Sequence, residues 1–330
     1  MSDTLVREDE FSPVEDIVLE DNVAEPAVGL SLEGQFDALE VIQSRSALGE
    51  VWLRLRKSKA FWFAATVIGF LLVVAVFPSL FTSKVPSPCE LQYSRAPMSS
   101  QFPLGADFQG CDILTRIIYG TRASISVGLL AAIGSTVLGT IFGVVAGFFG
   151  GVVDAILSRI TDIFFAIPMI LGAIVAVQIV ARENRGVLSL VVILVFFGWT
   201  GTARISRSAT IEVMTKDYVA AARTLGASRL RILGTHILPN ILAPLIVVVT
   251  MAIGGLISAE ASLSYLSIGL PPTVPSWGKA IADGQLTLKA NPGILLWPAA
   301  ALTVTVFAFL MLGEAVRHAF GPQAAKRVKR

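Results

Sequence analysis

The sequence predicts an all-α membrane protein with six transmembrane helices and both termini in the cytoplasm. Of its 330 residues, 54% are hydrophobic and only 15% are charged, whereas soluble domains carry about 25% charged residues. Six stretches are long enough, and free enough of charge, to cross a bilayer. Lysine and arginine are also distributed unevenly between the loops on the two sides.

The six spans follow from the uncharged stretches, because a helix that rises 1.5 Å per residue needs about 20 apolar residues to cross the bilayer. They run over residues 61–81, 123–149, 163–181, 186–203, 241–262 and 292–313. Gly150-Gly151 is expected to mark the end of the second span. Pro168 is expected to kink the third.

The basic residues of the loops set the orientation. With the N-terminus inside, the cytoplasmic segments after residue 50 collect 16 lysine and arginine residues and the outer segments 8, which is the distribution that short loops follow. Residues 1–50 carry a net charge of −11 and the remainder +13. Residues 1–47 are therefore expected to form an acidic, disordered cytoplasmic tail. It is either an inert tail or a regulatory contact for the basic tail at 320–330.

Glycine spacing in the second span predicts how that helix packs. Gly139, Gly143 and Gly147 lie four residues apart in the second span and predict close packing against another helix.

Segment 204–240, between the fourth and fifth spans, is too long for a simple connection. We expect two short helices there, separated at Gly226, with Pro239 ending the second. One stripe suited to docking in a groove of another protein is expected from Ala222, Leu225, Arg229, Leu230 and Leu233.

This loop resembles the coupling loop of the permease subunits of ATP-binding cassette (ABC) importers. Their pattern is Glu-Ala-Ala, three residues, Gly, nine residues, Ile or a similar residue, one residue, and Leu-Pro. Ala221, Ala222, Gly226 and Leu238-Pro239 match this pattern. Ala220 stands where the pattern has Glu, so this chain lacks the carboxylate that would form one hydrogen bond or ion pair with the ATPase partner. The resemblance implies that this loop contacts the ATPase subunits.

Three further blocks, in the same order, resemble the C-type permease subunits of dipeptide and oligopeptide importers. They are residues 103–128, residues 260–278, and Trp297-Pro298 with 313–317. The resemblance covers about residues 48–322. It implies a type I permease fold, in which 48–120 holds the first helix and an outer loop, and 121–319 forms a transport domain of five helices.

The same resemblance implies a role and a set of partners. The chain would form half of the translocation pathway of an ATP-driven peptide importer in the bacterial plasma membrane. It would pair with a B-type permease subunit, with two ATP-binding subunits or one fused ATPase, and with an extracytoplasmic peptide-binding lipoprotein. Membrane lipid would surround it, and nothing in the sequence points to nucleic acid.

No catalytic or metal-binding constellation is found in the sequence. No GxxxxGK[ST] segment occurs, so ATP and Mg²⁺ are expected on partner subunits and the chain is expected to be non-catalytic. His236 and His318 have no His or Cys neighbour at ligand spacing, and no metal or cofactor is expected in this chain.

A permease for nickel or another small solute stays an alternative. An intramembrane enzyme lacks a nucleophile–base pair, and the long loop argues against a stand-alone channel.

Three ionisable residues lie near span ends. Asp162 and Arg159, three residues apart on one helix, predict a structural ion pair, with a place along the translocation pathway as the alternative. Glu260, at the outer end of the fifth span, is either structural or lines the passage, where its carboxylate could meet the amine of a peptide.

Cys89 and Cys111 are the only cysteines of the chain, and both fall in the outer loop between the first two spans. That face is oxidising, so a disulfide closing the loop is expected, with two unpaired side chains as the alternative. Cys111 also stands where the resembling family often has Arg.

Overall fold

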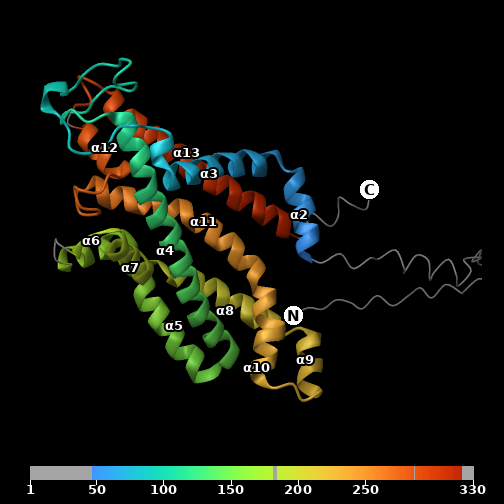
Figure 1. Cartoon of the computed structure of the whole chain (residues 1–330). Coiled ribbons are helices and arrows are strands. Elements are labelled where there is room, and N and C mark those ends of the chain that lie inside the picture. The colour runs from blue at the N-terminus through green and yellow to red at the C-terminus, as the bar shows by residue number, and fades with distance from the viewer. Residues whose placement is uncertain (1–46, 181–183, 286, 322–330) are drawn as a thin grey trace, which may run out of the picture. The chain divides into compact units, whose positions relative to one another are not determined.

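The computed structural model describes residues 47–180, 184–285 and 287–321, and in this part the regular elements are helices (Figure 1). One isolated antiparallel bridge joins Ala106 to Asp112. The acidic tail and most of the basic tail that the sequence predicts lie outside the described residues.

The described residues contain four to six candidate membrane spans, judged by helix length and composition. Four helices are long and apolar enough to cross a bilayer alone: α3 (Lys59–Val76), α4 (Ile113–Phe149), the continuous helix Arg229–Tyr265, and α13 (Gly293–Phe320). Two bent pairs can each form one more span. They are α5 (Gly151–Phe165) with α6 (Met169–Ile179), bent by 82°, and α7 (Val187–Gly198) with α8 (Thr200–Met214), bent by 48°.

The third predicted span is wrong in extent. Instead of one helix over 163–181, the chain forms α5 from Gly151 and α6 from Met169, with Pro168 at the sharp bend between them. Proline has no N–H to donate to the preceding turn, so the predicted kink is a complete break. The fourth span is also extended, because α8 runs to Met214 and takes up the first part of the predicted loop.

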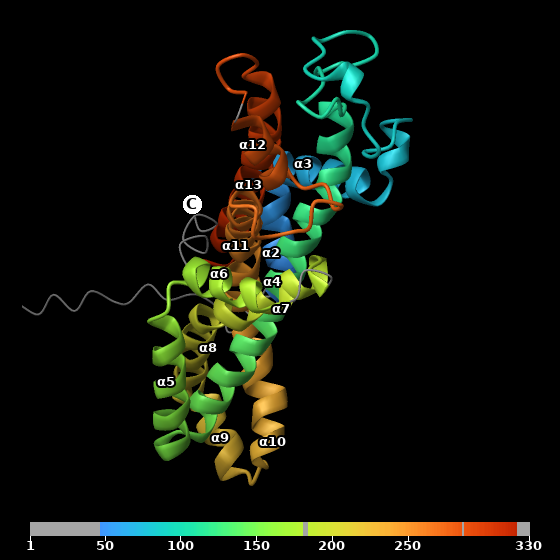
Figure 2. The same cartoon turned by 90° about the vertical axis from the view of Figure 1, so that its left-hand side faces the viewer.

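Helix α4 packs against α8, α11 (Leu238–Tyr265) and α7. In both views α12 (Trp277–Gln285) lies near one end of α4, and α9 (Asp217–Thr224) lies near the other (Figures 1 and 2). The predicted end of this helix is correct: α4 stops at Phe149, and Gly150 and Gly151 follow with φ of 65° and 54°. Its start at Ile113 lies ten residues before the predicted one.

The three spaced glycines of α4 all face α8. A Cβ on Gly139 would lie 2.5 Å from the backbone oxygen of Trp199, and one on Gly147 would lie 2.9 Å from that of Arg207. Between them, a Cβ on Gly143 would overlap the backbone oxygen of Ala203. The seam therefore brings the backbones of the two helices into direct contact, as small residues do in membrane proteins.

Two short helices were not expected from the sequence. Helix α2 (Ala47–Lys57) precedes the first span, and Arg54 donates from Nη1 to the backbone oxygen of Ala319 at the end of α13, at 3.1 Å. Helix α12 packs against α11 and α13. Both are too short to give a long apolar run, which is the signal that identified the spans.

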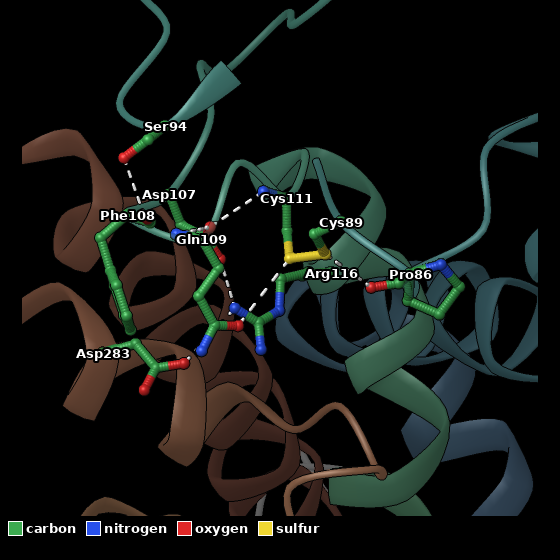
Figure 3. Close-up of a disulfide and its surroundings, with 9 residues drawn as sticks. All are labelled: Pro86, Cys89, Ser94, Asp107, Phe108, Gln109, Cys111, Arg116 and Asp283. Carbon is green, nitrogen blue, oxygen red and sulfur yellow. Dashed lines mark hydrogen bonds and ion pairs between the residues drawn. A yellow bond between two sulfur atoms is a disulfide. The ribbon is translucent and has the colours of Figure 1, made fainter. Parts of the chain in front are cut away.

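The segment between α3 and α4 is cross-linked. Cys89 and Cys111 form a disulfide with a Cα–Cα separation of 4.9 Å (Figure 3). Asp107 is buried beside it, and its Oδ1 accepts hydrogen bonds from the backbone N–H groups of Gln109 (2.8 Å) and Cys111 (2.9 Å). The chain next to Cys111 is therefore fixed by both a covalent bond and a buried carboxylate.

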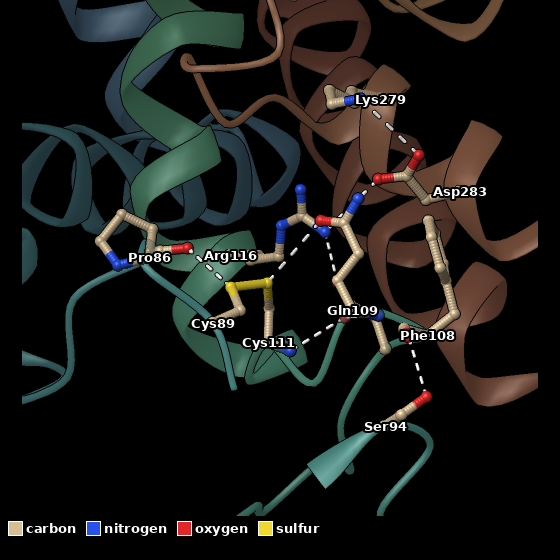
Figure 4. Close-up of polar contacts among 10 residues, drawn as sticks. Pro86, Cys89, Ser94, Phe108, Gln109, Cys111, Arg116, Lys279 and Asp283 are labelled. Carbon is tan, nitrogen blue, oxygen red and sulfur yellow. Dashed lines mark hydrogen bonds and ion pairs between the residues drawn. A yellow bond between two sulfur atoms is a disulfide. The ribbon is translucent and has the colours of Figure 1, made fainter. Parts of the chain in front are cut away.

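The same carboxylate joins this segment to two helices. Arg116, in the first turn of α4, pairs with Asp107 and lies 3.4 Å from Asp283 of α12. Lys279 reaches the other oxygen of Asp283 at 3.7 Å (Figure 4). Asp112 caps α4 by accepting from the backbone N–H of Thr115 at 3.1 Å.

We expect both cysteines to resist alkylation in intact, unreduced protein, because they are bonded to each other. After reduction, both should react, and mass spectrometry of the fragment spanning residues 89–111 would show two labels. Two labels without reduction would contradict the bond. Labels that require a membrane-permeant reagent would instead contradict the outer position of this segment.

Candidate coupling site

The loop that resembles a coupling loop folds into two short helices joined by a glycine turn. Helix α9 ends in a Schellman arrangement: the N–H of Ala227 bonds to the oxygen of Ala222, and that of Gly226 to the oxygen of Arg223, both at 3.0 Å. Gly226 has φ of +80°, and no atom lies within 4 Å of an added Cβ. The glycine is therefore required by the left-handed turn, and close packing of the backbone plays no part.

The second helix leads into the membrane without a stop, so the predicted role of Pro239 is wrong. Helix α10 (Arg229–Ile232) is capped by Ser228, whose Oγ accepts from the N–H of Arg231. A π-helical turn (Leu233–Ile237) then continues into α11, giving one helix over Arg229–Tyr265. The N–H of Leu238 bonds to the oxygen of Leu233, five residues back. This wider turn accommodates Pro239, which has no N–H of its own.

A hydrophobic cluster anchors the two short helices to the long ones. Val219 of α9 and Ile232 of α10 are buried together with Val213 of α8 and Val144 of α4. Ile237, Ile241 and Leu245 complete the cluster from the π turn and α11. The cluster therefore connects the two short helices to α4, α8 and α11.

The predicted single stripe is also wrong, because its members point two ways. Ala222 and Leu233 pack against the buried cluster, whereas Leu225 and Leu230 are 87% and 78% exposed. The glycine turn between the two helices separates the set that one continuous helix would have kept on one face. The outward leucines flank the turn, and the two short helices also carry three exposed arginines: Arg223, Arg229 and Arg231.

The remaining residues of the predicted coupling set lie at the same place. Ala220, Ala221 and Arg229 are exposed on the two short helices, and Leu238 and Pro239 are exposed at the start of α11. Sequence reasoning missed Val219, which is fully buried, and Tyr218, whose ring lies 5.9 Å from that of His236. An apolar residue before three alanines could have pointed to an inner face of α9.

Glu260 is enclosed within the chain, at the junction of α4, α11 and α12. Its two carboxylate oxygens accept hydrogen bonds from the hydroxyls of Ser124 (2.8 Å) and Ser264 (2.7 Å), and the side chain has no exposed surface. The backbone N–H of Trp277, at the start of α12, donates to the oxygen of Ser124 at 3.3 Å. The carboxylate therefore links three elements, which favours the structural alternative over a passage-lining one.

The predicted pair of Asp162 with Arg159 is wrong. Asp162 lies in the last turn of α5 and accepts from Nη2 of Arg204 on α8 at 2.7 Å. Arg159 is exposed, and among the residues that the structure describes it has no ion-pair partner. The three-residue spacing within one helix could not reveal a carboxylate whose partner lies on a different helix.

Comparison with known proteins identifies permease components of transport systems. Residues 139–326 match the family described as binding-protein-dependent transport system inner membrane component, and residues 46–100 match the N-terminal transmembrane domain of oligopeptide transport permease C. The oligopeptide transport system permease protein OppC of Bacillus subtilis (strain 168) is 33% identical over 284 residues, which cover 86% of this chain and 92% of that protein.

Two further relatives are similar to a comparable degree. The dipeptide transport system permease protein DppC of Alkalihalophilus pseudofirmus is 33% identical over 83% of this chain and 89% of its own. The glutathione transport system permease protein GsiD of Escherichia coli O6:K15:H31 is 32% identical over 285 residues, which cover 85% of this chain and 92% of that protein.

A solved structure supports the fold. One chain of the MetNI methionine ABC transporter, in an inward-facing conformation, superposes with a TM-score of 0.54 at 18% identity, over 68% of this chain and all of that one. The helical fold is therefore that of an ABC importer permease, and the family match spans more than half of the sequence. This chain belongs to the family of binding-protein-dependent transport system inner membrane components.

Proposed function

We propose that this chain is the transmembrane subunit of an ATP-driven importer of dipeptides or oligopeptides, and that it forms half of the translocation pathway. The observation that carries the proposal is the α9–α10 element, which presents Leu225 and Leu230 outward at a rigid glycine turn. An exposed apolar pair on a short helical element suits a groove on a partner protein. The names of the three relatives support a peptide as substrate.

Six spans with both termini in the cytoplasm follow if each bent pair crosses the membrane once. This arrangement places α9 and α10 inside, where ATP-binding subunits reside, and the disulfide segment outside, where disulfides persist. The excess of basic residues on the inner side supports the same orientation.

The partners are those of a complete importer. A B-type permease subunit forms the other half of the pathway, two ATP-binding subunits or one fused ATPase supply energy, and a peptide-binding lipoprotein delivers substrate outside. The energy source is assigned to partners because the sequence has no GxxxxGK[ST] segment to hold ATP phosphates. This chain contributes no catalytic group.

The mechanism is a transfer of movement. When ATP closes the ATPase subunits, the docked α9–α10 element moves with them. The buried cluster around Val219 and Ile232 then moves α4, α8 and α11, because these residues share one packed core. At the other end of α4 and α11, Glu260 keeps the start of α12 attached, so that the outer part of the bundle follows.

Reconstitution tests the proposal. Proteoliposomes with all partners should accumulate labelled dipeptides or oligopeptides only with ATP and the lipoprotein, and Ni²⁺ should not compete. The purified chain alone should neither bind nor hydrolyse ATP. Uptake of labelled Ni²⁺ that peptides do not compete for, without uptake of labelled peptides, would favour the nickel alternative. ATPase activity of the isolated chain, with contaminants excluded, would contradict its non-catalytic role.

A further inference from the structure

Helix α8 connects the coupling element to two other helices. It ends at Met214, and α9 begins three residues later at Asp217, so α8 is the first long helix that a displaced α9 moves. On one side it lies against the glycine seam of α4. A Cβ on Gly143 would lie 2.8 Å from the backbone nitrogen of Arg207, so the backbones of the two helices are in direct contact there.

On its other side α8 is joined to α5 by two ion pairs. Arg207 grips Asp154 with both Nε and Nη2, and the Nη2–Oδ2 distance is 2.6 Å. Ser158 also donates to that carboxylate, at 3.1 Å. The second pair is Arg204 with Asp162, and the guanidinium of Arg204 lies 3.8 Å from the ring centre of Phe165. The two arginines are three residues apart, and both reach α5.

Helix α5 buries little of its surface. Thr161 is its only buried residue, and its apolar contacts include those of the Phe164 ring with Phe196 (5.2 Å between ring centres) and Trp199 (5.7 Å). A pocket of about 390 Å³ opens between α4, α5 and α8, and its lining includes Phe142, Ser158, Asp162 and Arg204. An exposed ion pair contributes little free energy, but a charge-assisted hydrogen bond is directional. Two such pairs between α5 and α8 therefore favour movement of the two helices together.

We infer that the pairs Arg207–Asp154 and Arg204–Asp162 make α5 and α8 a single moving unit, so that displacement of the coupling element reaches α5 and, beyond the bend at Pro168, α6. The four side chains are positioning residues for transport, because they act through the helices that they join. The inference rests on the proposed function and adds to it the route by which movement reaches the third span.

A charge swap tests the route. Asp162→Arg places two arginines opposite each other and should lower the peptide imported per ATP hydrolysed by about fivefold. Adding Arg204→Asp should restore this ratio, because the reversed pair also suits the helix ends: an arginine near the C-terminus of α5 and an aspartate near the N-terminus of α8. The matched control is Glu50→Gln, which removes the exposed pair with Arg54 on α2 and should leave the ratio unchanged.

The ratio separates coupling from folding, because a loss of folded complex lowers uptake and hydrolysis together. If the intact complex imports no peptide, the proposed function fails. If it imports peptide and Asp162→Arg keeps a normal ratio, or the swap fails to restore a lowered one, the inference alone fails.

A distance measurement examines the same unit directly. Both native cysteines are bonded to each other, so nitroxide labels attach selectively to Ile156→Cys on α5 and Ile211→Cys on α8, which are exposed in this chain. In the reconstituted importer, their separation should be the same without nucleotide and with ATP trapped. In an Asp162→Arg/Arg207→Ala background it should differ between the two states. A nucleotide-dependent separation in the intact protein would overturn the inference.

Discussion

Replacing Gly143 with alanine is expected to force α4 away from α8 and to destabilise the chain by about 3 kcal/mol, at the upper end of what overpacking usually costs. The added methyl group would overlap the backbone oxygen of Ala203 and lie 2.7 Å from Cβ of Ser206. Backbone atoms cannot rotate away as a flexible side chain does, so the two helices must separate along the seam.

Gly255→Ala is the matched control, because Gly255 is also in the middle of a long helix and nothing lies within 4 Å of an added Cβ. Thermal unfolding of the purified chain in detergent, followed by the monodisperse fraction in size-exclusion chromatography, would compare the two. We expect a large loss for Gly143→Ala and none for Gly255→Ala. Equal stability of both variants would show that α4 and α8 are not in direct contact.

Replacing Gly226 with valine is expected to lower peptide uptake by about 5- to 30-fold. The turn requires φ of +80°, and a left-handed conformation costs an ordinary L-residue about 1–2 kcal/mol, more for a β-branched one. The substitution destabilises the conformation of the α9–α10 element that docks, so uptake should fall. Membrane insertion should be unchanged, because residue 226 lies between α9 and α10, outside the candidate spans.

Gly226→Asn provides the control, since asparagine adopts the left-handed region more readily than other residues with a side chain. It should keep most of the uptake, while Gly226→Val should also lose the response of ATP hydrolysis to substrate. Initial uptake rates per reconstituted complex are the measurement. If the asparagine and valine variants lose activity equally, side-chain bulk at the interface, and not the turn, is what matters.

The sequence indicated where the apolar segments lie but not where their helices begin and end. A charge-free criterion placed the third span after Asp162, yet α5 begins at Gly151 and carries three charged residues. Two of them are compensated by arginines of α8, which lies more than forty residues away in the chain. Ion pairs between helices distant in sequence cannot be derived from the pattern of one segment.

The candidate site was located by its glycine and alanines, and the turn geometry agrees with the expectation for Gly226. The direction of its side chains was not predictable. A helical stripe presupposes one helix, and the turn at Gly226 divides the stripe between an inner and an outer face. Likewise, proline in isolation predicts a helix end, whereas a π turn before Pro239 allows the helix to continue.

The glycine seam shows a different limit. Four-residue spacing of Gly139, Gly143 and Gly147 identified a packing face from local sequence, because that spacing places all three on one side of a helix. The identity of the opposite helix depends on the whole bundle. The structure supplies it as α8, and thereby connects the seam to the coupling element.

The central claim, that the α9–α10 element docks on an ATP-binding subunit, is tested most directly by a photo-cross-linking amino acid at Leu230. Leu242, exposed on α11 outside the element, is the comparison site. In the importer isolated from its native membrane through a tag on this chain, irradiation should join position 230 to an ATP-binding subunit, identified by mass spectrometry, and should not do so at position 242. If position 230 gives no adduct with a co-purified ATP-binding subunit while position 242 does, the coupling site is elsewhere.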